Sequence, residues 1–206
     1  MRIGFDFDNT IVSYDQLFYN VAIEKSLIPL DLSKSKLAVR DYLIKMNNES
    51  SWTELQGYVY GKRMNDAVVF EGAVEFIKLA RNNGIEIFIV SHKTKHPFIG
   101  PKFDLHEAAR EWIEIFLVDG VENLIEPAQV FFELTKEEKL SRIDQCECDF
   151  FIDDLPEILL MSGFPKKTGR ILFDPENFHD VGGMEVIVNS WQGVRAFFET
   201  IWKTGS

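Results

Sequence analysis

The sequence is poor in cysteine, with only Cys146 and Cys148 among 206 residues. A disulfide between cysteines two positions apart would close a small, strained ring, and two sulfurs alone make a poor metal site. We therefore expect neither a disulfide nor a thiolate metal centre, and we predict that both thiols are buried or partly buried.

Basic residues are also scarce. The chain carries 22 Lys and Arg against 33 Asp and Glu, which gives a formal net charge of −11 and an isoelectric point near 4.9. Binding a nucleic-acid backbone requires clustered Lys and Arg, so the composition argues against a nucleic-acid polymer as partner. A small anionic substrate stays compatible, because a local pocket can be positive in an acidic protein.

Long hydrophobic runs are missing as well. No stretch approaches the roughly 18 consecutive apolar residues of a membrane-spanning helix, and the N-terminus enters a predicted strand without an apolar leader. We therefore expect no membrane association and a soluble, cytoplasmic protein.

Hydrophobic residues, by contrast, are plentiful. They make up 46% of the chain, and phenylalanine alone occurs 18 times, mostly in packing positions by expectation. The length is enough for one domain of ordinary size plus a small insertion. The composition thus predicts a globular protein with a substantial core rather than a disordered one.

The N-terminal segment combines apolar and acidic residues in one strand. Over residues 3–8 apolar side chains alternate with Gly4, Asp6 and Asp8, which predicts a strand with its apolar face on one side and both carboxylates on the other. Asn9 and Thr10 end the pattern. Two carboxylates about 4 Å apart repel by roughly 4 kcal/mol at an effective dielectric of 20. A cation, a shared proton or open water must relieve that repulsion.

Three further segments place polar side chains at predicted strand ends or helix starts. Ser91 ends the apolar run 85–90, and Asp153 and Asp154 follow the apolar residues 150–152. Lysines stand at the start of the intervening helix. Of these, Lys139 is favoured because Leu140 and Ile143 should face the core beside it, with Lys136 as its rival.

The apolar runs alternate with predicted helices along the chain. They end at Asp6, Val90, Phe132, Ile152 and Phe173. This order predicts an α/β fold, a three-layer arrangement in which helices cover both faces of a parallel sheet. Strand ends of the same polarity then meet at one edge, where open α/β sheets bind ligands.

A cluster of carboxylates at that edge favours a hard cation. Oxygen ligands without clustered His or Cys point to Mg²⁺, held by Asp6, the backbone carbonyl of Asp8, and either Asp153 or Asp154. The nearby segment 92–102 is basic and holds no acid. It would either guide an anionic substrate electrostatically or form a solvated loop.

Together these residues resemble the haloacid dehalogenase (HAD) superfamily of phosphohydrolases, over about residues 2–160. The family's four motifs correspond, in chain order, to Asp6–Thr10, Ser91, Lys139 or Lys136, and Asp153 with Asp154. The resemblance implies the Rossmann-like HAD fold and a Mg²⁺-dependent phosphatase acting on a small phosphorylated metabolite, a sugar phosphate or a nucleotide.

The resemblance also implies roles for single residues. Asp6 would attack phosphorus to form an aspartyl-phosphate, and Asp8 would serve as general acid and then as general base. Ser91 and the lysine, Lys139 or Lys136, would hold the phosphoryl oxygens. An acid/base residue at position 8 favours a phosphatase over a dehalogenase, because a dehalogenase has no leaving oxygen to protonate.

Residues 14–70 lose the strand pattern and predict a small helical insertion. In the resembled family an insertion at this place is a cap over the site, which divides the chain into a core of residues 1–13 and 71–206 and a cap of residues 14–70. A helical region that serves only as scaffold is the alternative. The predicted substrate-binding residues are Asn9, Thr10, His92, Lys93, Tyr60, Lys62 and Arg63.

Two other function classes stay open. A receiver-like phosphoacceptor also uses acids, a hydroxyl and a lysine at a sheet edge, but its phosphorylated Asp lies on a later strand. A catalytically silent, HAD-like protein that binds a phosphorylated ligand would keep the site without the activity. A phosphate-release assay with Mg²⁺ and a panel of monoesters distinguishes the three.

Overall fold

A six-stranded parallel sheet forms the centre of the protein, in the strand order β10-β9-β8-β1-β4-β7. The computed structural model describes residues 1–179 and 182–204. The strands of this sheet are β1 (Arg2–Phe5), β4 (Glu86–His92), β7 (Val130–Glu133), β8 (Phe150–Asp153), β9 (Gly169–Phe173) and β10 (Val186–Val188). The predicted α/β class and parallel sheet are confirmed.

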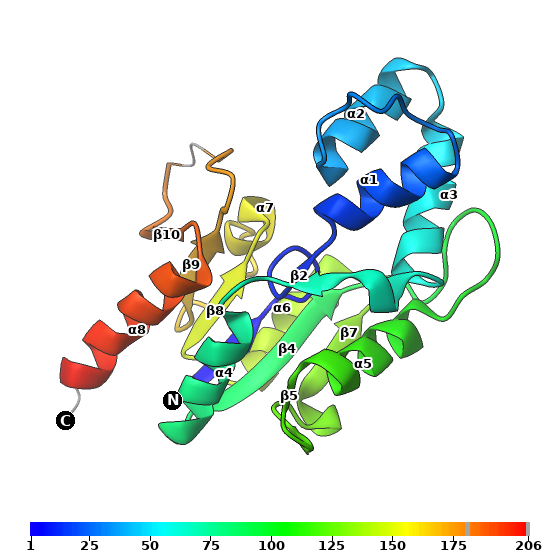
Figure 1. Ribbon diagram of the computed structural model, residues 1–206. Helices are drawn as coiled ribbons and strands as arrows, with labels where there is room; N and C mark the ends of the chain where they lie inside the picture. The colour runs from blue at the N-terminus through cyan, green and yellow to red at the C-terminus, as the bar shows by residue number, and fades with distance from the viewer. Residues whose placement is uncertain (180–181, 205–206) are drawn as a thin grey trace.

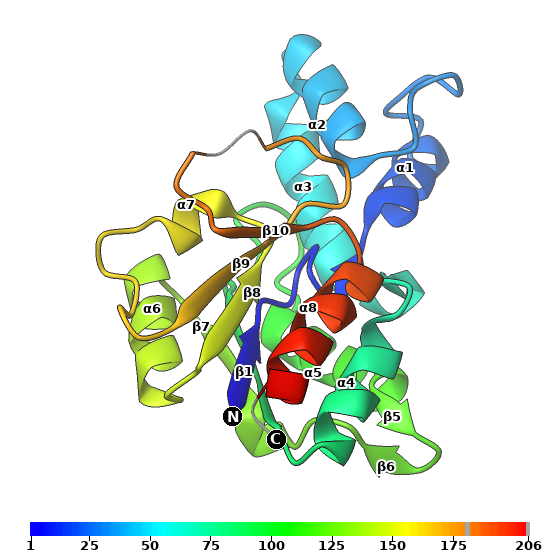
Figure 2. The same cartoon turned by 90° about the vertical axis from the view of Figure 1, so that its left-hand side faces the viewer.

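Helices cover both faces of this sheet, as Figure 2 shows. On one face lie α4 (Ala73–Asn82), α5 (Leu105–Phe116) and α8 (Trp191–Thr204), and on the other lie α6 (Lys136–Gln145) and the short α7 (Pro156–Leu159). Each face has its own cluster of buried side chains. The larger cluster, which takes in Ile3, Phe5 and Phe7, lies under α4, α5 and α8. The alternation in the first strand therefore does place its apolar side chains in the core.

The central position of β1 depends on a glycine. A Cβ on Gly4 would lie 2.5 Å from the ring of Phe151 and 2.9 Å from the Cys148 sulfur. Since real Cβ atoms do not approach so closely, only glycine lets the ring of the neighbouring strand β8 pack against β1. Both cysteines are free and buried, as predicted.

A helical insertion follows the first strand. It consists of α1 (Asp15–Glu24), α2 (Lys36–Lys45), α3 (Glu49–Tyr60) and the 3₁₀ turn η1 (Met64–Asp66), and its two ends pair as the antiparallel ribbon of β2 (Val12–Ser13) and β3 (Val68–Val69). In Figures 1 and 2 the insertion stands over the carboxyl ends of the central strands. It therefore lies at the edge where the site was predicted.

The details of the elements differ modestly from the sequence-based expectation. Asp104 caps α5 by accepting hydrogen bonds from the backbone N–H groups of His106 and Glu107. The α3 helix starts at Glu49, within the polar segment 47–51. The ribbon β2–β3 and the hairpin of β5 (Val118–Asp119) and β6 (Glu122–Asn123) were not predicted, because two-residue strands carry no periodicity. A second 3₁₀ turn, η2 (Pro127–Gln129), precedes β7.

Membrane insertion was predicted to be absent. Within residues 1–179 and 182–204 every helix is too short or too polar to span a bilayer.

Candidate active site

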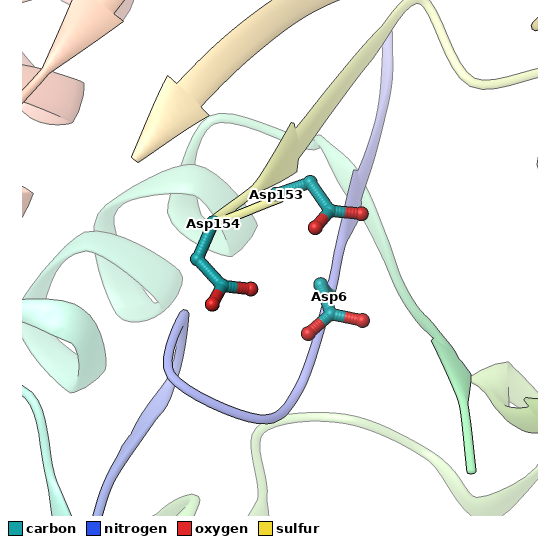
Figure 3. A group of neighbouring side chains, drawn as sticks. All are labelled: Asp6, Asp153 and Asp154. Carbon is teal, nitrogen blue, oxygen red and sulfur yellow. The ribbon is translucent and has the colours of Figure 1, made fainter. Parts of the chain in front are cut away.

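Three carboxylates meet where β1 and β8 end (Figure 3). Asp6 directly follows β1, and its backbone N–H donates to the carbonyl of Ile152 at 2.8 Å, so the two strands run side by side up to the site. Asp153 ends β8 and Asp154 follows it. One oxygen from each of Asp6, Asp153 and Asp154 lies within 4.8 Å of the others. Residues almost 150 positions apart in sequence thus form one oxygen-rich cluster.

A buried lysine neutralises part of this charge. The Nζ atom of Lys139 lies 2.6 Å from Asp6 Oδ1 and 2.6 Å from Asp153 Oδ2. The other candidate, Lys136, is half-exposed and forms an ion pair with Glu157. A capping box at Thr135 starts α6, so Lys139 falls in the second turn on the face that also buries Leu140. The structure therefore brings Lys139, and not Lys136, to the acidic cluster.

Ser91 completes the surroundings of Asp6. It lies inside β4, next to β1 in the sheet, and its hydroxyl donates to Asp6 Oδ1 at 2.9 Å. The same carboxylate oxygen therefore accepts hydrogen bonds from both Ser91 and Lys139. These contacts fix the orientation of the Asp6 carboxylate.

Two carboxylates of the cluster, Asp6 and Asp154, hold their protons more tightly than free aspartate does. Burial, reinforced by the charges of Asp153 and Asp8 and opposed by Lys139, raises the pKa of Asp6 to about 7. Burial and the charges of Asp6 and Asp153 also raise the pKa of Asp154. Without a cation this cluster retains protons near neutral pH. An oxygen-only donor set of this kind suits a hard divalent ion such as Mg²⁺.

The raised pKa of Asp6 predicts that Mg²⁺ binding depends on pH. The folded protein binds this proton more tightly than the unfolded chain, so the stability it contributes is present below about pH 4 and is lost as the pH rises through about 7. Mg²⁺ must displace the proton. We expect the increase in Tm on adding Mg²⁺ to grow from about pH 6 to about pH 8, as measured by calorimetry. An increase that does not change with pH would contradict this expectation.

Asp8 has partners of its own. Lys93 Nζ lies 2.7 Å from Asp8 Oδ2, and the hydroxyl of Tyr14 donates to Asp8 Oδ1 at 2.5 Å. Burial alone would raise the pKa of Asp8, but Lys93 and Tyr14 outweigh it and the pKa is lowered. Asp8 is therefore an anion at neutral pH, while the cluster beside it still holds protons.

The helical insertion contributes two side chains to the same region. Lys36, in the first turn of α2, places its Nζ atom 3.4 Å from Asn9 Oδ1, and Asn9 Nδ2 donates to Asp154 Oδ2 at 3.3 Å. Tyr60, the last residue of α3, packs its ring edge-on against Tyr14 with centroids 5.0 Å apart. Burial alone would lower the pKa of Lys36, but Tyr60, Asp8 and Asp154 outweigh burial, so that the pKa is raised. Lys36 is thus a cation that reaches the site from the insertion.

These groups surround a cavity of about 300 Å³, which we call the central cavity. Asp154 lines it, whereas Asp153 is fully buried behind it and faces Lys139. The other predicted residues that line the central cavity are Asp6, Asp8, Asn9, Tyr60, Ser91, His92, Lys93 and Lys139.

Three predicted substrate-binding residues lie away from the central cavity. Arg63 forms ion pairs with Glu24 and Asp66, so its guanidinium is bound to carboxylates within the insertion. Lys62 is exposed on the turn after α3 and does not line the central cavity. Thr10 is fully buried, and its carbonyl accepts from the indole of Trp191 at 3.0 Å.

Tyr14 and Lys36 contact predicted site residues but were not themselves predicted. Tyr14 is one aromatic among many, so its type carried no signal for a hydrogen bond to Asp8. Lys36 was missed because a lysine in a polar turn resembles any solvated lysine, and its role depends on where α2 lies. Ser35 could have indicated that a helix starts at Lys36, because serine is a preferred N-cap residue. In the structure Ser35 does cap α2, by accepting a hydrogen bond from the backbone N–H of Ala38.

Comparison with solved structures identifies the architecture. A HAD family hydrolase from Deinococcus radiodurans, with bound phosphate and sodium, matches with a TM-score of 0.62 at 13% identity, over 97% of this chain and 95% of that one. This chain has the haloacid dehalogenase fold. No protein-family model matches the sequence, and no curated protein matches it.

Other structures with the HAD fold match at a similar level. A predicted phosphoglycolate phosphatase from Haemophilus somnus gives a TM-score of 0.58 at 12% identity, over 95% of this chain and 96% of that chain. A putative HAD hydrolase from Bacillus subtilis, bound to magnesium, gives 0.55 at 12% identity, over 95% and 97%. At such identities the likeness establishes the fold, and the similar lengths show that the HAD fold takes up nearly the whole chain.

Proposed function

We propose that this protein is a Mg²⁺-dependent phosphatase that hydrolyses a small phosphomonoester through an aspartyl-phosphate. The observation that carries the proposal is the environment of Asp6. Its carboxylate lies at the wall of the central cavity, oriented by Ser91 and Lys139 and within 4.8 Å of the Asp154 carboxylate. A nucleophile, a cation and a metal-binding acid are thus in contact.

The donor set suits the metal. Asp6, Asp154 and the backbone carbonyl of Asp8 would hold Mg²⁺. Asp153 would position Lys139, which in turn contacts Asp6. Bound Mg²⁺ would supply positive charge to a phosphoryl group next to Asp6. Lys139 and Ser91 are placed to bind phosphoryl oxygens on the other side.

The chemistry then follows in two halves. Asp6 Oδ attacks phosphorus and the bond to the leaving alcohol breaks, with Asp8 donating a proton to the departing oxygen. Asp8 next takes a proton from water, whose oxygen attacks the aspartyl-phosphate and releases phosphate and free Asp6. Atoms and charges balance over the cycle, because the proton that Asp8 gives is recovered from the water.

Lys93 offers a way to change the protonation of Asp8 between these roles. It holds Asp8 as an anion while the site is free of substrate. A phosphoryl dianion in the central cavity competes for the same ammonium group. Once Lys93 turns to the phosphoryl group, Asp8 loses the cation that most stabilises its anionic form. Asp8 can then take up the proton that it must donate.

We further propose that the segment 14–70, with helices α1–α3, acts as a cap and that residues 1–13 and 71–206 form the catalytic core. Lys36 and Tyr60 reach from these helices into the central cavity. They would cover the phosphoryl group and exclude water during the first half of the reaction.

A phosphate-release assay tests the proposal. The purified protein is incubated with a panel of phosphomonoesters, including sugar phosphates and nucleoside monophosphates, with Mg²⁺ or with a chelator. We expect turnover of at least one compound with Mg²⁺ and its loss with the chelator. Binding of these compounds without release of phosphate would instead identify a catalytically silent binding protein.

A further inference from the structure

A second cavity opens beside the central one. It encloses about 460 Å³ and shares Asn9, Lys36 and Asp154 with the central cavity. Its other walls come from Asp15, from α2, from Phe70, from the end of β9 and from the segment that follows β9. We call it the side cavity. A group attached to a phosphate in the central cavity would extend into it.

The side cavity has an aromatic wall. The rings of Phe70 and Phe173 pack edge-on with their centroids 5.1 Å apart, and both line the cavity together with Phe178. Phe178 is 61% exposed. An exposed aromatic side chain beside two packed ones provides an apolar surface on which a flat ring can lie.

The wall is held in place before any ligand arrives. Asp174 is buried, and its two carboxylate oxygens accept from the backbone N–H groups of Phe178 at 3.0 Å and His179 at 2.9 Å. On the opposite side Asp15 accepts from the backbone N–H of Lys36 at 2.7 Å, which fixes the start of α2. Both walls are thus tied down by charge-assisted hydrogen bonds.

Apart from the shared residues, the side cavity is acidic. Three carboxylates line it, from Asp15, Asp174 and Glu176, against the single guanidinium of Arg40. Burial and the charges of Asp15 and Asp174 raise the pKa of Glu176, so these carboxylates affect one another. A ligand that carried a second anion here would meet repulsion, whereas hydroxyl groups would find acceptors.

We propose that the side cavity binds the leaving group of the substrate and selects a neutral, hydroxyl-bearing ring, as in a sugar phosphate or a nucleoside monophosphate, over a small alcohol that carries a carboxylate. This inference rests on the proposed phosphatase function. Aromatic faces accommodate the ring, and Glu176 and its neighbours accept hydrogen bonds from the hydroxyl groups. The specificity of the site then depends on residues of α2 and of the segment after β9.

The first part of the test compares substrates on the wild-type protein. The kcat/KM for a hexose 6-phosphate and for a nucleoside 5′-monophosphate is measured against that for phosphoglycolate and phosphoserine, which carry a carboxylate. We expect at least one ring substrate to exceed both carboxylate substrates by about tenfold or more. Turnover in which phosphoglycolate or phosphoserine leads would overturn the inference and leave the phosphatase proposal intact.

The second part reverses one charge. Glu176 is exposed and forms no hydrogen bond or ion pair among the described contacts, so Glu176→Lys should fold normally. We expect it to raise KM for the ring substrate and to lower KM for phosphoglycolate, which changes the ratio of their kcat/KM values about tenfold. Glu122→Lys, in the β6 hairpin at the far end of the molecule in Figures 1 and 2, carries the same charge change and should keep the wild-type ratio. Equal ratios in the two variants would overturn the inference.

The third part does not require turnover. Binding of the hexose 6-phosphate and of phosphoglycolate is measured by titration calorimetry on Asp6→Asn with Mg²⁺, with and without Glu176→Lys. Tighter binding of the ring compound, with its preference weakened by Glu176→Lys, supports the inference even if the wild type releases no phosphate. Equal binding of the two compounds, or binding of neither, would overturn it.

Discussion

Asp6→Asn is expected to reduce phosphate release by roughly 10³-fold or more, since an amide cannot form the aspartyl-phosphate. Asp6 is the carboxylate that Ser91 and Lys139 orient at the wall of the central cavity. The substitution keeps the size and shape of the side chain. It also removes a buried carboxyl group whose pKa is raised to about 7, so we expect no loss in the free energy of unfolding.

The measurement is single-turnover and steady-state phosphate release with the best substrate of the panel, together with Tm to verify folding. Asp144→Asn is the matched control, because Asp144 is exposed on α6 and belongs to neither cavity. The control should retain wild-type rates. Substantial Mg²⁺-dependent activity in Asp6→Asn would remove the nucleophile from the proposed mechanism.

Lys139→Met is expected to lower the free energy of unfolding by about 3–5 kcal/mol in a chelator. The ammonium group of Lys139 is the partner of two buried carboxylates, at 2.6 Å from each of Asp6 and Asp153. Methionine keeps the apolar stem but leaves both acids without a cation. Because natural proteins unfold with only about 5–15 kcal/mol, a loss of this size would be plain in urea denaturation.

Adding Mg²⁺ should recover part of that loss, since the ion replaces positive charge between the same carboxylates. Activity should stay low, because the phosphoryl oxygens lose a donor. The matched control is Lys136→Met, which breaks a half-exposed ion pair with Glu157 and should cost at most about 1 kcal/mol. Equal destabilisation by the two substitutions would contradict the buried role of Lys139.

Predictions from the sequence held where a pattern repeats along the chain. Alternation in residues 3–8 and apolar runs before Ser91 and Asp153 predict strands, and parallel strands place their carboxyl ends at one edge. Convergence of Asp6 with Asp154 follows from that rule. The sequence left open whether Lys139 or Lys136 approaches Asp6, because that depends on where α6 lies beside the sheet.

Other features could not be derived from local pattern. Tyr14 and Lys36 meet Asp8 and Asn9 only because the ribbon β2–β3 and helix α2 bring the insertion over the sheet. Arg63, a plausible anion-binding residue by type, is instead paired with Glu24. The type of a side chain predicts what a residue can bind. Which groups lie next to that residue depends on the packing between segments far apart in sequence.

The sequence by itself determined the class of fold, the edge of the sheet that carries the carboxylates, and the oxygen-only chemistry of the donor groups there. These follow from periodicity and from ligand chemistry, which act locally. The tertiary structure alone decided which lysine reaches Asp6, which acid faces the central cavity, and how the insertion and the segment after β9 enclose the side cavity. Those depend on the positions of helices relative to the sheet, which are set by the burial of the whole core rather than by any one segment.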